Sequence, residues 1–123
     1  MNPEVQRLVP LIHVADVPQS IEFYKKLGFS IRNTFVPPAE EDPSWVWLEN
    51  ETAVLMIAKA ERPVVASQQA ILFYLYCDDI SKMHDFLISE NVDCSTITYP
   101  FYALKGEFRV KDPDGYILMI THT

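Results

Sequence analysis

The sequence repeats itself at an offset of 63 residues. The segment VLMI at 54–57 returns as ILMI at 117–120. The same offset pairs other large apolar residues: Val17 with Ile80, Phe23 with Phe86, Phe29 with Val92, Trp45 with Phe108, and Trp47 with Val110. A pattern kept in constant register, without an insertion, predicts two similar halves. Neither half is expected to close its own hydrophobic face, so we expect the two to pack as a pair around a cleft.

Each half predicts the element order βαβββ. In the first half we expect a strand at 8–15, a helix at 17–27 and strands at 29–35, 45–48 and 52–57. In the second we expect a strand at 71–77, a helix at 80–90, an extended segment at 92–99 and strands at 107–111 and 116–121. The sequence therefore predicts an α+β fold with two βαβββ modules in tandem. We assign residues 1–123 to one domain, with half-modules at 8–57 and 71–121 and a connector at 58–70.

The ends of both predicted helices carry recognisable signals. Asp16 and Asp79 stand at the N-terminal ends, where a carboxylate accepts hydrogen bonds from free backbone N–H groups. Gly28 and Asn91 stand at the C-terminal ends, and both residue types tolerate left-handed backbone. The run DPDG at 112–115 is a typical tight turn.

Composition and charge narrow the function classes. The chain has 123 residues, 49% of them hydrophobic, and a net charge of −7. The charge disfavours nucleic acid and anionic membranes as partners and is compatible with a cationic small ligand. No apolar run reaches 18 residues and the N-terminus lacks a signal-peptide core, so we expect no membrane span and no export. Cys77 and Cys94 have no paired spacing, which favours reduced thiols in a cytoplasmic protein.

Four motifs carry a family resemblance. They are PLIHVAD at 10–16, SIEFY at 20–24, LGF at 27–29 and GEFRVKDPDG at 106–115. Together they resemble the vicinal oxygen chelate superfamily, which includes glyoxalase I, extradiol dioxygenases, fosfomycin-resistance enzymes and bleomycin-resistance proteins. The chain most resembles the bleomycin-resistance branch, whose members bind the drug without chemistry and act as dimers. The resemblance implies an eight-stranded open mixed sheet around a cleft, and a homodimer.

The resemblance also locates the metal ligands of the metal-using members. In this sequence those positions are apolar: Val9, Met56, Leu72 and Met119. Hard divalent cations need oxygen or imidazole ligands, and thioethers replace them poorly. We therefore expect no metal and no cofactor, and the metal-dependent glyoxalase and dioxygenase reactions become improbable.

Strand alternation from these four positions predicts the ligand-binding residues. Leu11 and His13 share the face of Val9, and Tyr74 and Tyr76 share the face of Leu72. Two exposed aromatic residues on a loop are expected to close the cleft, and two methionines to line it. The predicted ligand-binding residues are Leu11, His13, Met56, Tyr74, Tyr76, Phe101, Tyr102 and Met119. The alternative for His13 is a neutral histidine whose hydrogen bonds are satisfied by the backbone or by neighbouring residues, and the alternative for Tyr74 and Tyr76 is that they fill the core.

Other polar and aromatic residues leave two interpretations open. Trp45 and Trp47 are core residues if their counterparts Phe108 and Val110 are a guide, or else a stacking wall for the ligand. Glu107 is either an anionic contact for the ligand or, as we favour, a structural hydrogen-bond acceptor. The acidic loop at 37–43 is a solvated segment that would attract cations if it lay near a cleft.

The sequence predicts a binding protein that sequesters a small aromatic or cationic molecule as a homodimer. The alternative is a metal-independent lyase or isomerase in which His13, Tyr76 or Glu107 moves a proton. That alternative lacks an evident pair of catalytic groups. A binder of an ordinary metabolite, with no role in drug resistance, is a third possibility.

Overall fold

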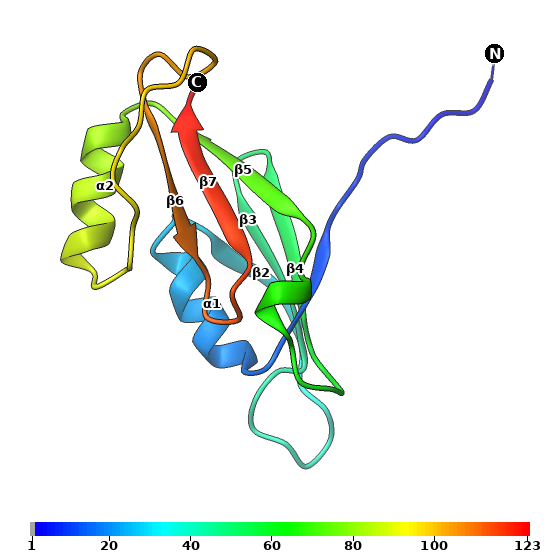
Figure 1. The fold of residues 1–123 in the computed structure, drawn as a ribbon. Helices are drawn as coiled ribbons and strands as arrows, with labels where there is room; N and C mark the ends of the chain where they lie inside the picture. The colour runs from blue at the N-terminus through cyan, green and yellow to red at the C-terminus, as the bar shows by residue number, and fades with distance from the viewer. Residues whose placement is uncertain (1) are drawn as a thin grey trace. The chain divides into compact units, whose positions relative to one another are not determined.

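The computed structural model describes residues 2–123 (Figure 1). The chain divides between Val64 and Val65 into two compact units, and this boundary falls inside the connector at 58–70. No helix within residues 2–123 is both long and apolar enough to cross a membrane. The two units are described separately below.

The first unit contains one helix and a four-stranded sheet, which we call the N-terminal sheet. Its strands stand in the order β1-β4-β3-β2, with β1 parallel to β4 and the other neighbours antiparallel. The helix α1 contacts β4 and β2. Alternate residues of β1, β3 and β4 are buried, among them Val14, Val46 and Ile57 at 0% exposure, whereas β2 is exposed throughout. The elements are β1 Leu11–Val14, α1 Val17–Lys25, β2 Ser30–Phe35, β3 Trp45–Asn50 and β4 Ala53–Lys59.

The second unit contains the C-terminal sheet, in the order β5-β7-β6. Here β5 is parallel to β7, and β6 is antiparallel to β7. The helix α2 lies on the side of Phe108, because the His84 ring on α2 meets the Phe108 ring edge-on with centroids 4.8 Å apart. The elements are a short 3₁₀ helix at Ala66–Gln68, β5 Leu72–Cys77, α2 Ile80–Ser89, β6 Glu107–Lys111 and β7 Ile117–His122.

The predicted helix ends and the DPDG turn are confirmed. Asp16 accepts a hydrogen bond from the backbone N–H of Gln19, and Asp79 accepts one from Lys82, each at 3.0 Å. Gly28 and Asn91 have φ angles of 95° and 62°. In the turn, Asp112 Oδ1 accepts hydrogen bonds from the backbone N–H groups of Asp114 and Tyr116. The caps start the two helices at positions 63 residues apart, and the left-handed residues Gly28 and Asn91 follow their C-terminal ends.

The α+β class and the glyoxalase/bleomycin-resistance fold are confirmed, but the strand count is corrected. Residues 2–123 form seven strands in two sheets, instead of eight strands in one. Segment 92–99 makes only isolated bridges, Cys94 with Val110 and Thr98 with Glu107. Between them the Ser95 hydroxyl accepts the backbone N–H of Arg109 at 2.9 Å, so a side chain occupies a place that a ladder hydrogen bond would take.

The 63-residue repeat holds for the parallel strand pairs and fails for β3 and β6. Leu11 pairs with Met56 in the first unit, and Tyr74 pairs with Met119 in the second. Tyr74 follows Leu11 by 63 positions, and Met119 follows Met56 by the same number. On the other side of the last strand of each unit, however, Met56 pairs with Trp47 and Met119 pairs with Arg109. Arg109 follows Trp47 by only 62 positions. Our expectation of constant register without an insertion is therefore wrong for these strands.

The cause is the length of the hairpin turn. Four residues separate Glu49 from its partner Val54, whereas five separate Lys111 from its partner Ile117. A slip of one residue moves every side chain of a strand to the opposite face of the sheet. The structural counterparts of Trp45 and Trp47 are consequently Glu107 and Arg109, and not Phe108 and Val110.

The helix ends give a matched pair of stability predictions. Gly28→Ala should destabilise the protein by about 1–2 kcal/mol, because alanine is strained at positive φ. Its Cβ would also stand 2.7 Å from Asn50 Nδ2. The control Asn91→Gly keeps a backbone conformation that glycine adopts freely, so it should change stability by only a few tenths of a kcal/mol. Urea unfolding measures both, and an equal loss in the two variants would contradict the argument.

Candidate functional site

The predicted ligand-binding residues of the first unit lie on one face of the N-terminal sheet. We call it the tryptophan face, and it is the face opposite the buried strand residues. Two rows of paired residues cross it. One row joins Leu11, Met56, Trp47 and Asn33, and the other joins His13, Ala58, Trp45 and Phe35. The structure thus brings Leu11, His13 and Met56 together with both tryptophans, and the core interpretation of Trp45 and Trp47 is wrong.

The tryptophan face is apolar with a polar margin. Both indoles are half-buried, and the Trp47 Nε1–H donates a hydrogen bond to Glu49 Oε1 at 2.8 Å. Glu49 is also 3.7 Å from the Arg32 guanidinium. The hydrogen bond fixes the orientation of one large aromatic plane, while the rest of the indole presents an apolar surface.

The corresponding face of the C-terminal sheet carries the other predicted strand residues. We call it the tyrosine face, and it lies opposite α2. One row joins Tyr74, Met119 and Arg109, and a second joins Tyr76, Thr121 and Glu107. The two tyrosines on the edge strand β5 are exposed, whereas Met119 and Glu107 are buried. Two equivalent positions therefore differ in chemistry between the units: they carry Trp45 and Trp47 on β3, and Glu107 and Arg109 on β6.

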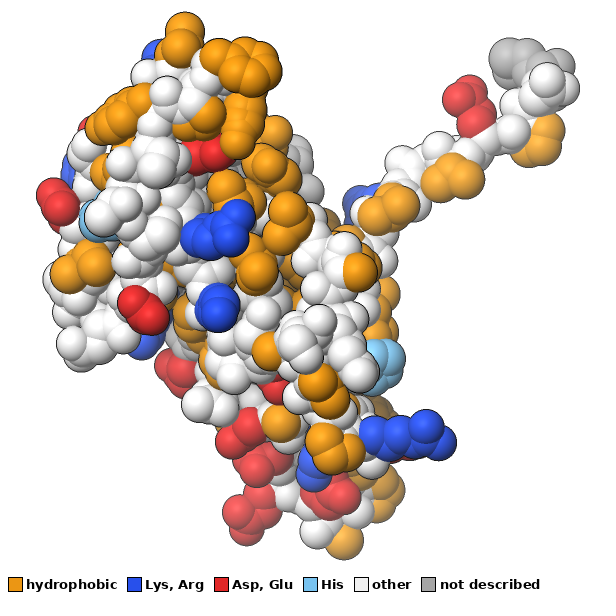
Figure 2. Space-filling model, viewed as in Figure 1, with side chains coloured by type: hydrophobic (Ala, Val, Ile, Leu, Met, Phe, Trp, Pro, Cys, Tyr) orange, Lys and Arg blue, Asp and Glu red, His pale blue; other side chains and the backbone are white. Residues whose placement is uncertain are grey.

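The predicted aromatic loop is attached to the tyrosine face. The Tyr102 hydroxyl donates a hydrogen bond of 2.7 Å to Glu107 Oε1. The Phe101 ring stacks on Tyr102 with centroids 5.4 Å apart and remains 92% exposed. Figure 2 shows hydrophobic side chains gathered over this loop, whose other exposed members include Tyr99 and Leu104. Tyr74, Tyr76, Met119, Phe101 and Tyr102 therefore share one region of the second unit.

The Glu107 contact changes the acidity of the loop tyrosine. Donation of the Tyr102 hydroxyl to the Glu107 carboxylate raises the pKa of Tyr102 above its usual 10, and burial and the negative charge of Glu107 act in the same direction. Tyr74 also interacts electrostatically with Tyr102. Sequence reasoning favoured a structural role for Glu107, and its hydrogen bond to the loop agrees with that role. Its place on the face of Tyr76 could not be predicted, because the 63-residue offset assigned the counterparts of Trp45 and Trp47 to Phe108 and Val110.

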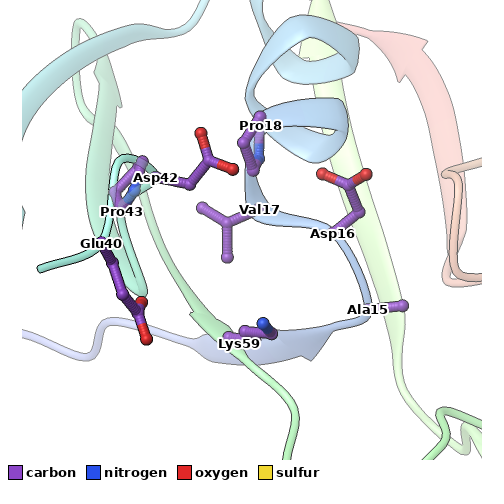
Figure 3. Close-up of a pocket in the computed structure, with 8 residues that line it drawn as sticks. All are labelled: Ala15, Asp16, Val17, Pro18, Glu40, Asp42, Pro43 and Lys59. Atoms are coloured by element: carbon purple, nitrogen blue, oxygen red, sulfur yellow. The ribbon is translucent and has the colours of Figure 1, made fainter. Parts of the chain in front are cut away.

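A small open hollow lies elsewhere in the first unit, between the start of α1 and the acidic loop (Figure 3). Its volume is about 220 Å³. None of the predicted ligand-binding residues lines it. It carries three carboxylates and one ammonium group, and Asp16 among them already caps α1. The lining residues are Ala15, Asp16, Val17, Pro18, Glu40, Asp42, Pro43 and Lys59.

The ionisable side chains offer little for metal or thiol chemistry. Within residues 2–123, no three His, Cys, Asp or Glu side chains are grouped so that they could hold a metal ion. Cys77 and Cys94 are free, and burial raises the pKa of both thiols. For Cys77 a hydrogen bond with the backbone of Asp79 partly opposes this effect, whereas the negative charges of nearby aspartates add to it in both cases. Neither thiol is therefore activated as a nucleophile.

The fold and these faces can be compared with known proteins. The model of the Glyoxalase/Bleomycin resistance protein/Dioxygenase superfamily matches residues 6–120. The chain belongs to this superfamily. A search of curated proteins found no match.

Several solved structures share the fold at low sequence identity. TnmS3, an antibiotic-binding protein from Streptomyces sp. CB03234, aligns with a TM-score of 0.77 and 15% identity over 98% of each chain. A bleomycin resistance determinant encoded on the transposon Tn5 gives 0.73 and 16%, over 97% of this chain and 98% of that one. The bleomycin-binding protein of Streptomyces verticillus in complex with copper(II)-bleomycin gives 0.69 and 19%, over 99% of each chain.

The Tyr102–Glu107 hydrogen bond can be tested by titration. Glu107→Gln removes the negative charge, so the pKa of Tyr102 should fall toward its usual value of about 10. In the wild type the pKa of Tyr102 is raised in the folded protein. The protonated hydroxyl therefore donates its hydrogen bond at neutral pH, and this bond is lost as the pH rises through the raised pKa of the folded state. Difference absorbance of tyrosinate measures the shift, with Tyr102→Phe identifying the signal. An identical titration of wild type and Glu107→Gln would contradict the contact.

Proposed function

We propose that this protein binds a small aromatic molecule without transforming it, as a binder of the bleomycin-resistance type. The observation that carries the proposal is the chemistry of the two sheet faces. Each displays aromatic side chains where a sheet exposed only to water would display polar ones: Trp45 and Trp47 in one unit, and Tyr74 and Tyr76 in the other. Tyrosine and tryptophan combine a large apolar surface with a polar atom, which suits reversible ligand binding.

The aromatic loop adds support to this proposal. A phenylalanine that is 92% exposed costs free energy in water unless something covers it, and contiguous exposed apolar side chains commonly mark binding surfaces. The solved structures of similar fold include proteins that bind bleomycin or another antibiotic. An antibiotic of that kind is accordingly the first ligand to try, with ordinary aromatic metabolites as the second set.

We further propose that binding needs no metal ion or cofactor. The positions that the family uses for metal ligands are apolar in this chain, at Val9, Met56, Leu72 and Met119. A metal-independent lyase or isomerase would need an acid–base group that titrates near neutral pH. Tyr102 does not supply such a group, because its hydrogen bond to the Glu107 carboxylate raises its pKa further above neutrality. We therefore favour binding over catalysis on the chemistry of the two sheet faces, which display aromatic side chains. The free thiols agree with a cytoplasmic location, which we also propose.

A homodimer is part of the proposal. The segment before β1 is extended and exposes Val5 and Leu8 at 86% and 84%, so it offers apolar surface for a second copy of the chain. Light scattering at micromolar concentration should give about twice the 14.2 kDa of one chain. Replacing both residues by serine should reduce the mass to that of the monomer. A monomeric wild type would refute the dimer.

The binding proposal is tested with a ligand screen and one matched pair of variants. Purified protein in EDTA is titrated with bleomycin and with aromatic metabolites, and binding is followed by calorimetry. Tyr76→Ala should weaken binding by about 1–3 kcal/mol, because stacking and buried apolar area are lost. Since Tyr76 is 64% exposed, the fold should survive.

Phe86→Ala serves as the control, because this exposed aromatic residue lies on α2 and away from the tyrosine face. It should leave the affinity unchanged. An equal loss of affinity in both variants, or unfolding of Tyr76→Ala, would show that the tyrosine face is not the site. A requirement for added metal would refute the metal-free mode of binding.

A further inference from the structure

We infer that Glu107 selects ligands that carry an organic cation, such as an ammonium or guanidinium group, beside their aromatic part. The inference rests on the proposed binding function and assigns the charge of the ligand. It starts from the position of Glu107, which is on the tyrosine face in the same row as Tyr76. A carboxylate at this place can meet a ligand that covers the exposed tyrosine.

Within residues 2–123 the charge of Glu107 has no ion-pair partner, and the positive charge of Arg109 stands two residues further along β6 on the same face. The residue is only 5% exposed. Its side chain accepts one hydrogen bond, from the Tyr102 hydroxyl. A buried carboxylate loses hydration free energy that a neutral hydroxyl regains only in part. A cation brought by the ligand would supply the missing partner, in a setting where water competes poorly.

The fold itself does not require an acid here. The residue of the first unit at the equivalent position, paired with Ala58 as Glu107 is paired with Thr121, is Trp45. Hydrogen bonding to the loop does not require a charge either, because a neutral amide oxygen accepts from a tyrosine hydroxyl equally well in geometry. The negative charge is therefore the one property of Glu107 that neither the sheet nor the loop uses.

The surroundings of the carboxylate favour an organic cation over a small inorganic one. Three aromatic rings belong to this region, those of Tyr76, Phe101 and Tyr102, and the faces of such rings attract ammonium and guanidinium groups. A metal ion would need further oxygen or nitrogen ligands, which no group of His, Cys, Asp or Glu side chains within residues 2–123 provides.

Arg109 limits where the cation can bind. It lies two residues further along β6 on the same face, and its positive charge acts on Tyr102 against that of Glu107. A cationic ligand is thus repelled from the Arg109 side and directed to the side of the aromatic loop. Removing this charge should favour the cation further.

The test compares two probes of nearly equal shape, phenethylammonium and the neutral 2-phenylethanol, by calorimetry at low salt. Wild type should bind the ammonium about tenfold more tightly, the size expected for one charge-assisted contact supported by aromatic rings. In Glu107→Gln, which keeps an acceptor for Tyr102, the ratio should fall close to one. In Arg109→Gln, an exposed and therefore tolerant site, the ratio should rise about threefold.

The outcomes separate this inference from the function on which it rests. Equal binding of both probes by wild type would overturn the role of Glu107 and leave the aromatic binding proposal standing. A ratio of ammonium to alcohol affinity that is unchanged in Glu107→Gln would also overturn the role of Glu107. If Glu107→Gln does not fold, Arg109→Gln decides instead, and a fall of the ratio in that variant would overturn the role. Failure of both probes to bind wild type would overturn the inference and count against the tyrosine face as a binding surface.

Discussion

The parallel pairing of the first strand of each unit with its last strand fixes the rest of that unit. In both units the partners stand in the same register, Leu11 with Met56 and Tyr74 with Met119. Because side chains alternate along a strand, this pairing decides which residues enter the core and which line the opposite face. The helix caps at Asp16 and Asp79 then return the chain across the sheet at equivalent places.

Features set by a few neighbouring residues could be predicted from the sequence. The caps, the left-handed helix ends and the DPDG turn depend on local geometry, and each is found where the residue types indicate. The faces of β1, β4, β5 and β7 could be predicted as well, because the 63-residue offset holds there. The faces of Trp45 and Trp47 could not, since the offset hid the extra residue in the second hairpin turn.

Features that depend on contacts between side chains were outside the reach of the sequence pattern. Segment 92–99 has extended character, but the Ser95 hydroxyl takes the backbone N–H of Arg109 and the regular strand does not form. Likewise the attachment of the aromatic loop depends on the Tyr102–Glu107 hydrogen bond. The pairs Ser95–Arg109 and Tyr102–Glu107 are not marked by any particular residue spacing or composition, so the sequence pattern could not predict these contacts.

The one-residue difference between the hairpin turns also explains how a repeated scaffold carries two different surfaces. If the second turn had the length of the first, strand β6 would present Phe108 and Val110 on the tyrosine face and would turn Glu107 and Arg109 toward α2. That arrangement would place two charges in the core between the sheet and the buried side of α2, at a cost of several kcal/mol. The longer turn keeps Phe108 and Val110 in the core at 1% exposure and places the charged residues beside the tyrosines. The chemistry of this face is therefore a property of the turn as much as of the strand.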